Sequence, residues 1–126
     1  MGECFDIAAA AETFVRRHEK TREHRRRLHE RACTDFARII DMTIREYQPR
    51  RILQWGSLLE PDDFDENSDI DIAVEGLADA RTFLELLGKA VSMTDFTVDL
   101  VEWEKLDQDS RESIQRRARV VYERQG

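Results

Sequence analysis

The sequence contains few cysteines, glycines and prolines, and it lacks any long apolar run. Its 126 residues include two Cys, five Gly and two Pro. Cys4 and Cys33 are too few for a disulfide framework or a structural zinc site. No stretch approaches the roughly 20 apolar residues of a membrane-spanning helix, and the start, MGECFDIAAAAE, has acids where a signal peptide has bases. We therefore expect a cytoplasmic protein with no membrane partner.

Length and composition indicate one globular domain. A chain of 126 residues is long enough for one domain and short for two. Charged residues make up 37% and hydrophobic residues 40%, which excludes a disordered or fibrous protein. We expect a single domain over residues 1–126, in which a helical segment (1–48) precedes an α/β core (49–126).

Charge is divided unevenly along the chain. Residues 1–51 hold 12 bases and 9 acids (net +3), and residues 52–126 hold 8 bases and 18 acids (net −10), which together give −7. An acidic protein repels nucleic acid, so a nucleic-acid partner would depend on the basic segment from Arg16 to Arg31. Acids interrupt this segment at helical salt-bridge spacing, as in Glu23 and Arg27. The spacing favours a solvated helix face, with a binding surface as the alternative.

The first third of the chain predicts a long helix. No Gly or Pro occurs from Ala8 to Tyr47, which favours one long helix or two in tandem. Apolar residues recur every three or four positions in its second half, at Leu28, Ala32, Phe36, Ile39, Ile40, Thr43 and Tyr47. The segment from Arg16 to Arg27 has no apolar residue, so it must contact a partner, project into solvent or fray.

The rest of the chain alternates between strand and helix patterns. Strands are expected at 51–55, 69–74, 96–101 and 119–123, and helices at about 77–93 and 106–118. The first of these helices should bury Ala80, Phe83, Leu84, Leu87 and Val91. We expect an α+β fold: a small mixed sheet with helices packed on one face, preceded by the long helix.

An acidic cluster is the sharpest anomaly in the sequence. Residues 60–71 contain seven acids and no base. Strict alternation with Ile70, Ile72 and Val74 puts Asp69 and Asp71 on one strand face, about 6.6 Å apart. At an effective dielectric constant near 20, two carboxylates at that distance repel by about 2.5 kcal/mol. A bound cation would turn this repulsion into attraction. The four acids between 62 and 66 are expected to form a solvated loop.

A third carboxylate and a glycine extend the predicted site. Asp99 joins Asp69 and Asp71 if its strand lies beside theirs with Val98 and Leu100 facing the core. Oxygen ligands alone suit Mg²⁺, and the spacing does not fit a calcium loop. Gly56 ends a strand, where it lets the backbone approach a phosphate, and Ser57 adds a hydroxyl and an amide.

The order Gly56, Ser57, Asp69, Asp71 and Asp99 resembles the signature of the minimal nucleotidyltransferase (MNT) domains of the DNA polymerase β-like superfamily. The resemblance runs from about Leu28 to the end of the chain. It implies that the three aspartates are catalytic and bind two Mg²⁺ ions, with Asp99 helping to deprotonate the attacking hydroxyl. It also implies that Gly56, Ser57 and Ser68 bind the nucleoside triphosphate.

The same resemblance implies transfer of a nucleoside monophosphate, AMP from ATP, to a hydroxyl of a partner protein or a small acceptor. Many small members are antitoxins that pair with a helical HEPN toxin. We expect no second domain for an acceptor, so a HEPN-like partner or a second copy of the chain would bring it, with the N-terminal helix as the expected contact.

One departure from the family pattern leaves a second hypothesis open. Leu58, Leu59 and Glu60 follow Gly-Ser, where family members commonly have an Arg and a Gly. An acid in place of a cation should weaken triphosphate binding unless Arg50, Arg51 or a partner compensates. The alternative is a catalytically impaired binding module of the same fold that neutralises a partner protein.

Overall fold

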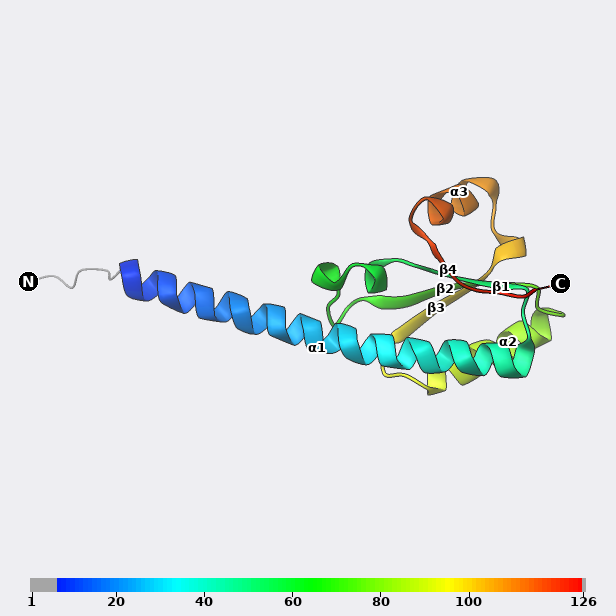
Figure 1. Ribbon diagram of the computed structural model, residues 1–126, viewed down its shortest axis with the longest axis horizontal. Helices are drawn as coiled ribbons and strands as arrows, with labels where there is room; N and C mark the ends of the chain where they lie inside the picture. The colour runs from blue at the N-terminus through cyan, green and yellow to red at the C-terminus, as the bar shows by residue number, and fades with distance from the viewer. Residues whose placement is uncertain (1–6, 126) are drawn as a thin grey trace, which may run out of the picture.

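The computed structural model describes residues 7–125, so Cys4 lies outside the described residues. The elements follow the predicted order and confirm an α+β fold (Figure 1). They are α1 (Ile7–Tyr47), β1 (Arg51–Trp55), the 3-10 turns η1 (Ser57–Leu59) and η2 (Pro61–Asp63), β2 (Asp69–Glu75), α2 (Ala80–Ser92), β3 (Thr97–Glu102), the 3-10 turn η3 (Trp103–Lys105), α3 (Gln108–Arg117) and β4 (Arg119–Glu123). No helix within this range is long and apolar enough to cross a membrane.

The four strands form one mixed sheet in the order β3-β2-β1-β4. β1 pairs antiparallel with both β2 and β4, whereas β2 and β3 run parallel. A parallel pair needs a crossover, and α2 supplies it between β2 and β3. The predicted placement of the strand containing Asp99 beside the strand containing Asp71 is therefore confirmed.

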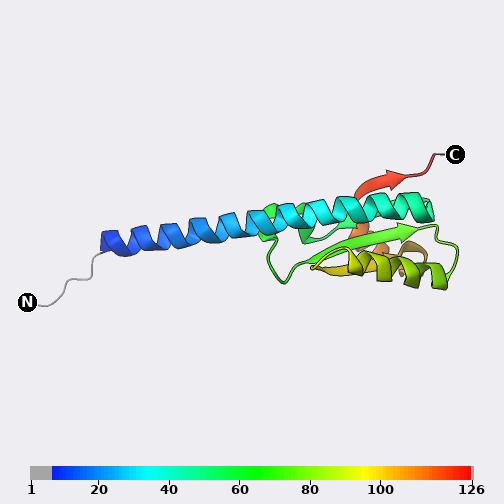
Figure 2. The same cartoon turned by 90° about the horizontal axis from the view of Figure 1, so that it is seen from below.

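α1 is one continuous helix of 41 residues, about 60 Å long. Its second half packs on the sheet through the predicted apolar stripe, and the buried residues are Leu28, Ala32, Phe36, Ile39, Ile40, Met42 and Thr43. Its first half projects beyond the end of the sheet (Figures 1 and 2). We call residues 7–27 the arm; its side chains are exposed except for a partly buried Ala10.

The buried face of α2 differs from the prediction. Leu86 and Ala90 are buried, and Phe83 and Leu87 pack against the same core. Leu84 and Val91, which were expected inside, are 64% and 51% exposed, and Ala80 is exposed as well. Positions 83, 86, 87 and 90 follow the i, i+3, i+4, i+7 pattern of one helix face, and this face meets the sheet.

Helices cover both faces of the sheet, which corrects the prediction of helices on one face. α1 and α2 cover the face that presents Ile52, Ile70, Ile72, Val74 and Leu100. α3 lies on the opposite side (Figure 1), over a smaller cluster of Leu53, Ala73, Trp103 and Ile114. The face of β2 toward α3 is only partly polar, because Ala73 follows the two aspartates on it. The apolar part of this face must be shielded from water, and α3 does so.

Candidate active site

The paired strands β2 and β3 bring the three predicted aspartates to one face of the sheet. Asp71 lies directly opposite Asp99 in the parallel register, and Asp69 lies opposite Thr97. Their neighbours Ile70, Ile72 and Leu100 are buried in the α1 side of the core. Because side chains alternate along a strand, the three carboxylates face the other side, which carries α3. Asp69 and Asp71 are partly buried and Asp99 is exposed.

Gly56 contacts this cluster directly. It follows β1, where Trp55 lies opposite Asp71, and its backbone has a φ of 84°, which disfavours any residue with a side chain. A Cβ atom at this position would also overlap Oδ2 of Asp71. Glycine is therefore required twice, by the backbone conformation and by the carboxylate that packs against it.

The three carboxylates of this site interact with one another. Burial, followed by repulsion from Asp99 and then Asp69, raises the pKa of Asp71 to about 7. A hydrogen bond with Asp99 also favours the protonated form of Asp71. The site therefore holds more negative charge than its own side chains can balance.

The donor set fits a hard divalent cation. The three side chains offer only carboxylate oxygens, which are the ligands that Mg²⁺ takes, and the raised pKa of Asp71 marks uncompensated negative charge. They do not close around a common centre, because no three His, Cys, Asp or Glu side chains of residues 7–125 form a ready metal site. Asp69, Asp71 and Asp99 would hold such an ion together with oxygens from a substrate.

Comparison with known families agrees with this geometry. The family described as Polymerase beta, Nucleotidyltransferase matches residues 37–126. The chain belongs to this nucleotidyltransferase family. The matched segment contains all four strands and every predicted site residue. No curated protein matches the sequence.

Several solved structures that are similar to this chain are toxin–antitoxin complexes. One is a toxin–antitoxin crystal structure with AMP-PNP, at 27% identity, with 70% of this chain and 73% of that chain covered and a TM-score of 0.57. Two others show likeness of fold. The MntA-HepT toxin–antitoxin has 23% identity, coverage of 72% and 72%, and a TM-score of 0.56. The tri-AMPylated Shewanella oneidensis HEPN toxin in complex with MNT antitoxin has 22% identity, coverage of 74% and 73%, and a TM-score of 0.57.

The two serines predicted to bind nucleotide have different surroundings. Ser57 begins η1 directly after Gly56, and its carbonyl accepts a hydrogen bond from the amide of Glu60. The Ser68 hydroxyl accepts a hydrogen bond from the Asp65 amide at 2.9 Å and donates to Asp65 Oδ1 at 3.4 Å. Ser68 therefore stabilises the turn that leads into Asp69, which is a positioning contact; its binding of nucleotide stays a prediction.

The two arginines that could have compensated for Glu60 lie at the end of β1 far from Gly56. Arg51 is opposite Glu75, four residues along the strand from Trp55, and its guanidinium stacks 4.9 Å from the Trp103 ring centre. Arg50 precedes it and is exposed. Arg50 and Arg51 are therefore not placed to compensate for Glu60, which leaves compensation by a partner as the remaining condition. Arg119, which pairs with Gln54, is a β4 cation at the Gly56 end of the strand.

His29 makes a contact that the sequence analysis did not predict. His24 and His18 are exposed, but His29 is partly buried and its Nε2 is 2.7 Å from the carbonyl oxygen of Leu58 in η1. Its ring also packs edge-on against Phe64, with 5.7 Å between centroids. The sequence feature that could have revealed this contact is the position of His29 next to Leu28, at the margin of the apolar stripe of α1. His29 ties α1 to the turn that follows Gly56.

Proposed function

We propose that the protein transfers AMP from ATP to a hydroxyl group of a partner protein, with Mg²⁺ bound by Asp69, Asp71 and Asp99. The observation that carries this proposal is the register that sets Asp71 opposite Asp99 while Gly56 packs against Asp71. Membership in the nucleotidyltransferase family supports the reaction class. ATP is a cytoplasmic substrate, and the cytoplasm is the location that we propose.

In the proposed reaction, the acceptor oxygen attacks the α-phosphorus of ATP and pyrophosphate leaves as the bond to the β-phosphate oxygen breaks. Asp99, the exposed member of the three, accepts the hydroxyl proton. Gly56 and Ser57 hold the phosphates through the backbone and the hydroxyl, and Ser68 keeps the turn before Asp69 in place. Bound Mg²⁺, two ions in the family pattern, would neutralise charge on the phosphate oxygens.

A partner protein is the acceptor that we favour, and a HEPN-like toxin is the proposed class. The supporting observation is that similar solved structures are toxin–antitoxin complexes, one of which contains a tri-AMPylated HEPN toxin. The whole chain would act as one domain, with residues 49–126 as the catalytic core. The helical segment 1–48, which carries the exposed arm, would contact the partner or a second copy of the chain.

Transfer of label from α-³²P-ATP tests the proposal directly. The chain is co-expressed with the protein encoded beside it, and the purified complex is incubated with labelled ATP and Mg²⁺. We expect label on the partner, and its loss in Asp71→Asn. Asp109→Asn, which removes an exposed carboxylate at the start of α3, should leave the label unchanged. Equal labelling by both variants would exclude the aspartate site.

A binding module without catalysis is the second candidate, and the position of Arg50 and Arg51 favours it. These arginines lie away from Gly56, so neither of them is placed to compensate for the charge of Glu60. Calorimetry with Mg-ATP separates the two candidates. Heat of binding that disappears in the Asp69→Asn, Asp71→Asn double variant favours the enzyme. No heat above dilution, together with a stable complex with the partner, favours the module.

A further inference from the structure

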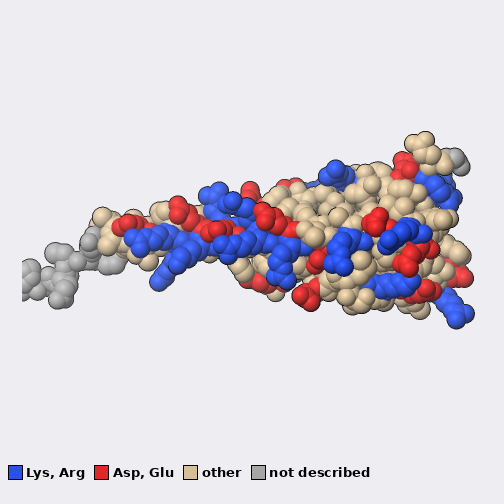
Figure 3. Space-filling model, turned by 60° about the horizontal axis from the view of Figure 1, so that its bottom comes forward, with Lys and Arg blue, Asp and Glu red and all other residues tan. Residues whose placement is uncertain are grey.

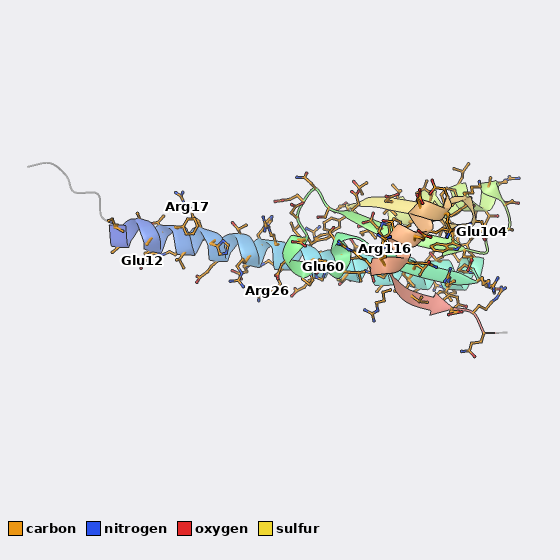
Figure 4. The ribbon with its side chains drawn as sticks, turned by 90° about the horizontal axis from the view of Figure 1, so that it is seen from above. Glu12, Arg17, Arg26, Glu60, Glu104 and Arg116 are labelled. Atoms are coloured by element: carbon orange, nitrogen blue, oxygen red, sulfur yellow. The ribbon has the colours of Figure 1, made fainter. Side chains whose placement is uncertain are left out.

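A basic hollow lies where the arm meets the rest of the molecule. It has a volume of about 450 Å³ and is lined by His18, Arg22, Arg25 and Arg26 of α1 and by Pro61 and Asp62 of η2. We call it the arginine pocket. None of the predicted active-site residues lines it. Figure 4 labels Arg26 on α1 and Glu60 just before η2, the two segments that form its walls.

Some cations of α1 form ion pairs and others do not; among residues 7–125 the arginines of this pocket belong with Arg17, Lys20 and Arg38 to the group without one. Arg16, Arg27 and Arg31 each have a carboxylate within ion-pair distance. In the part of the chain that the structure describes, Arg22, Arg25 and Arg26 form no such pair. Residues three and four positions apart lie on the same side of a helix, where like charges repel. Three uncompensated guanidinium groups therefore gather beside one hollow.

The charge and size of the pocket fit a chain of phosphate groups. Guanidinium groups bind phosphate oxygens through paired hydrogen bonds, and three arginines can serve three phosphates. A protein ligand that offered a single carboxylate would neutralise only one of the three arginines. Asp62 already contributes one acid to the lining. The volume lies within the range of about 300–1,000 Å³ that small-molecule sites have.

The surroundings favour a compact ligand over a nucleic acid. Lys and Arg side chains run along α1, including the arm (Figure 3). The loop beside the pocket, however, carries Glu60, Asp63, Asp65 and Glu66. An extended nucleic-acid backbone that followed the arm past this loop would meet these four acids, whereas a triphosphate confined to the hollow would meet the one acid of its lining, Asp62.

We propose that the arginine pocket binds the triphosphate group of a small molecule, at a second site separate from the aspartates. The ligand would contact Pro61 and Asp62, which belong to the segment that continues from Ser57 through η1 into η2. It would thereby link the arm to the turn that follows Gly56. The site depends on arginines and needs no metal ion.

Calorimetry with sodium triphosphate in EDTA at low salt tests the proposal. Without metal, the aspartates repel the probe and cannot contribute to binding. We expect one site per chain and at least tenfold weaker binding in Arg22→Ala, Arg26→Ala. The matched control is Arg17→Ala, Lys20→Ala, which removes the same charge from the same helix outside the pocket lining. The control should bind within twofold of the original chain. Circular dichroism melting checks that both variants fold.

Three results would overturn the proposal. One is the absence of triphosphate binding to the original chain, and another is equal loss in both double variants, which would indicate diffuse attraction to the whole helix. The third is tighter binding of a 20-nucleotide RNA than of triphosphate. The Asp69→Asn, Asp71→Asn variant should bind triphosphate normally. Because AMP transfer needs these aspartates and metal-free triphosphate binding does not, the two proposals fail separately.

Discussion

Substitution of Gly56 by alanine gives the sharpest test of how the site is built. The new Cβ would overlap Oδ2 of Asp71, and the residue would have to keep a φ of 84°. With a ψ of −164°, this backbone conformation belongs to a region that glycine alone adopts readily, and it costs an alanine about 1–2 kcal/mol. Displacement of the partly buried Asp71 adds a further ~1–2 kcal/mol, the size of a typical packing or strain defect. We expect Gly56→Ala to lower the free energy of unfolding by about 2–4 kcal/mol.

A double-mutant cycle with Asp71→Ala separates the two costs. Urea unfolding is measured for the original chain, both single variants and the double variant. When Asp71 is already alanine, the overlap is absent and only the backbone cost of about 1–2 kcal/mol should remain. Gly88 is the control glycine, since a Cβ there meets no atom within 4 Å and Gly88→Ala in α2 should stabilise by ~1 kcal/mol. Equal costs of Gly56→Ala in both backgrounds would refute the contact.

Three further predictions concern pH, the α1 contact and the core. Because the pKa of Asp71 is raised to about 7, its contribution to stability is complete below pH ~4 and is lost as the pH rises through 7. Urea unfolding without metal should show that the free energy of unfolding falls by about 1–2 kcal/mol over this range, a figure reduced for solvent screening. Mg²⁺ should restore more of this free energy at pH 8 than at pH 6. A free energy of unfolding that does not change with pH would contradict the raised pKa. His29→Ala should cost about 1–2 kcal/mol because it leaves the Leu58 carbonyl unpaired, and normal stability would contradict that contact. Thermal melting should show a loss of about 2–4 kcal/mol for Leu86→Ala and under about 0.5 kcal/mol for Leu84→Ala; the reverse order would restore the face first predicted for α2.

Periodicity predicted the packing of α1 but not that of α2. The stripe from Leu28 to Thr43 is long, and polar residues occupy the other sides of the helix, so only one face could be buried. α2 has 13 residues with apolar side chains on more than one side, including Leu84 and Val91. Spacing alone does not choose between such faces. The position of the β2–β3 pair decides which face of α2 is buried, and that position is set by the tertiary structure.

The position of α3 could not be predicted from the sequence, for a related reason. Only Ile114 of this helix is buried, so its amphipathic signal is weak. Trp103 and Ala73, which it covers, come from other elements. The convergence of Asp71 and Asp99 was predictable because alternation fixes the face of each strand. The contact between Gly56 and Asp71 was not, because it depends on the antiparallel pairing of β1 with β2.

Two independent costs meet at the Asp71 side chain. Its burial near Asp99 and Asp69 raises its pKa, so the ionised form opposes folding at neutral pH. Because the Asp71 side chain packs against position 56, that position must be glycine, and the flexibility of glycine in the unfolded chain lowers the free energy of unfolding. An apolar residue at 71 with an ordinary residue at 56 would remove both costs. A fold that keeps this carboxylate in place needs a compensating gain in free energy, and the proposed Mg²⁺ ion beside a phosphate would supply one at this point of the sheet.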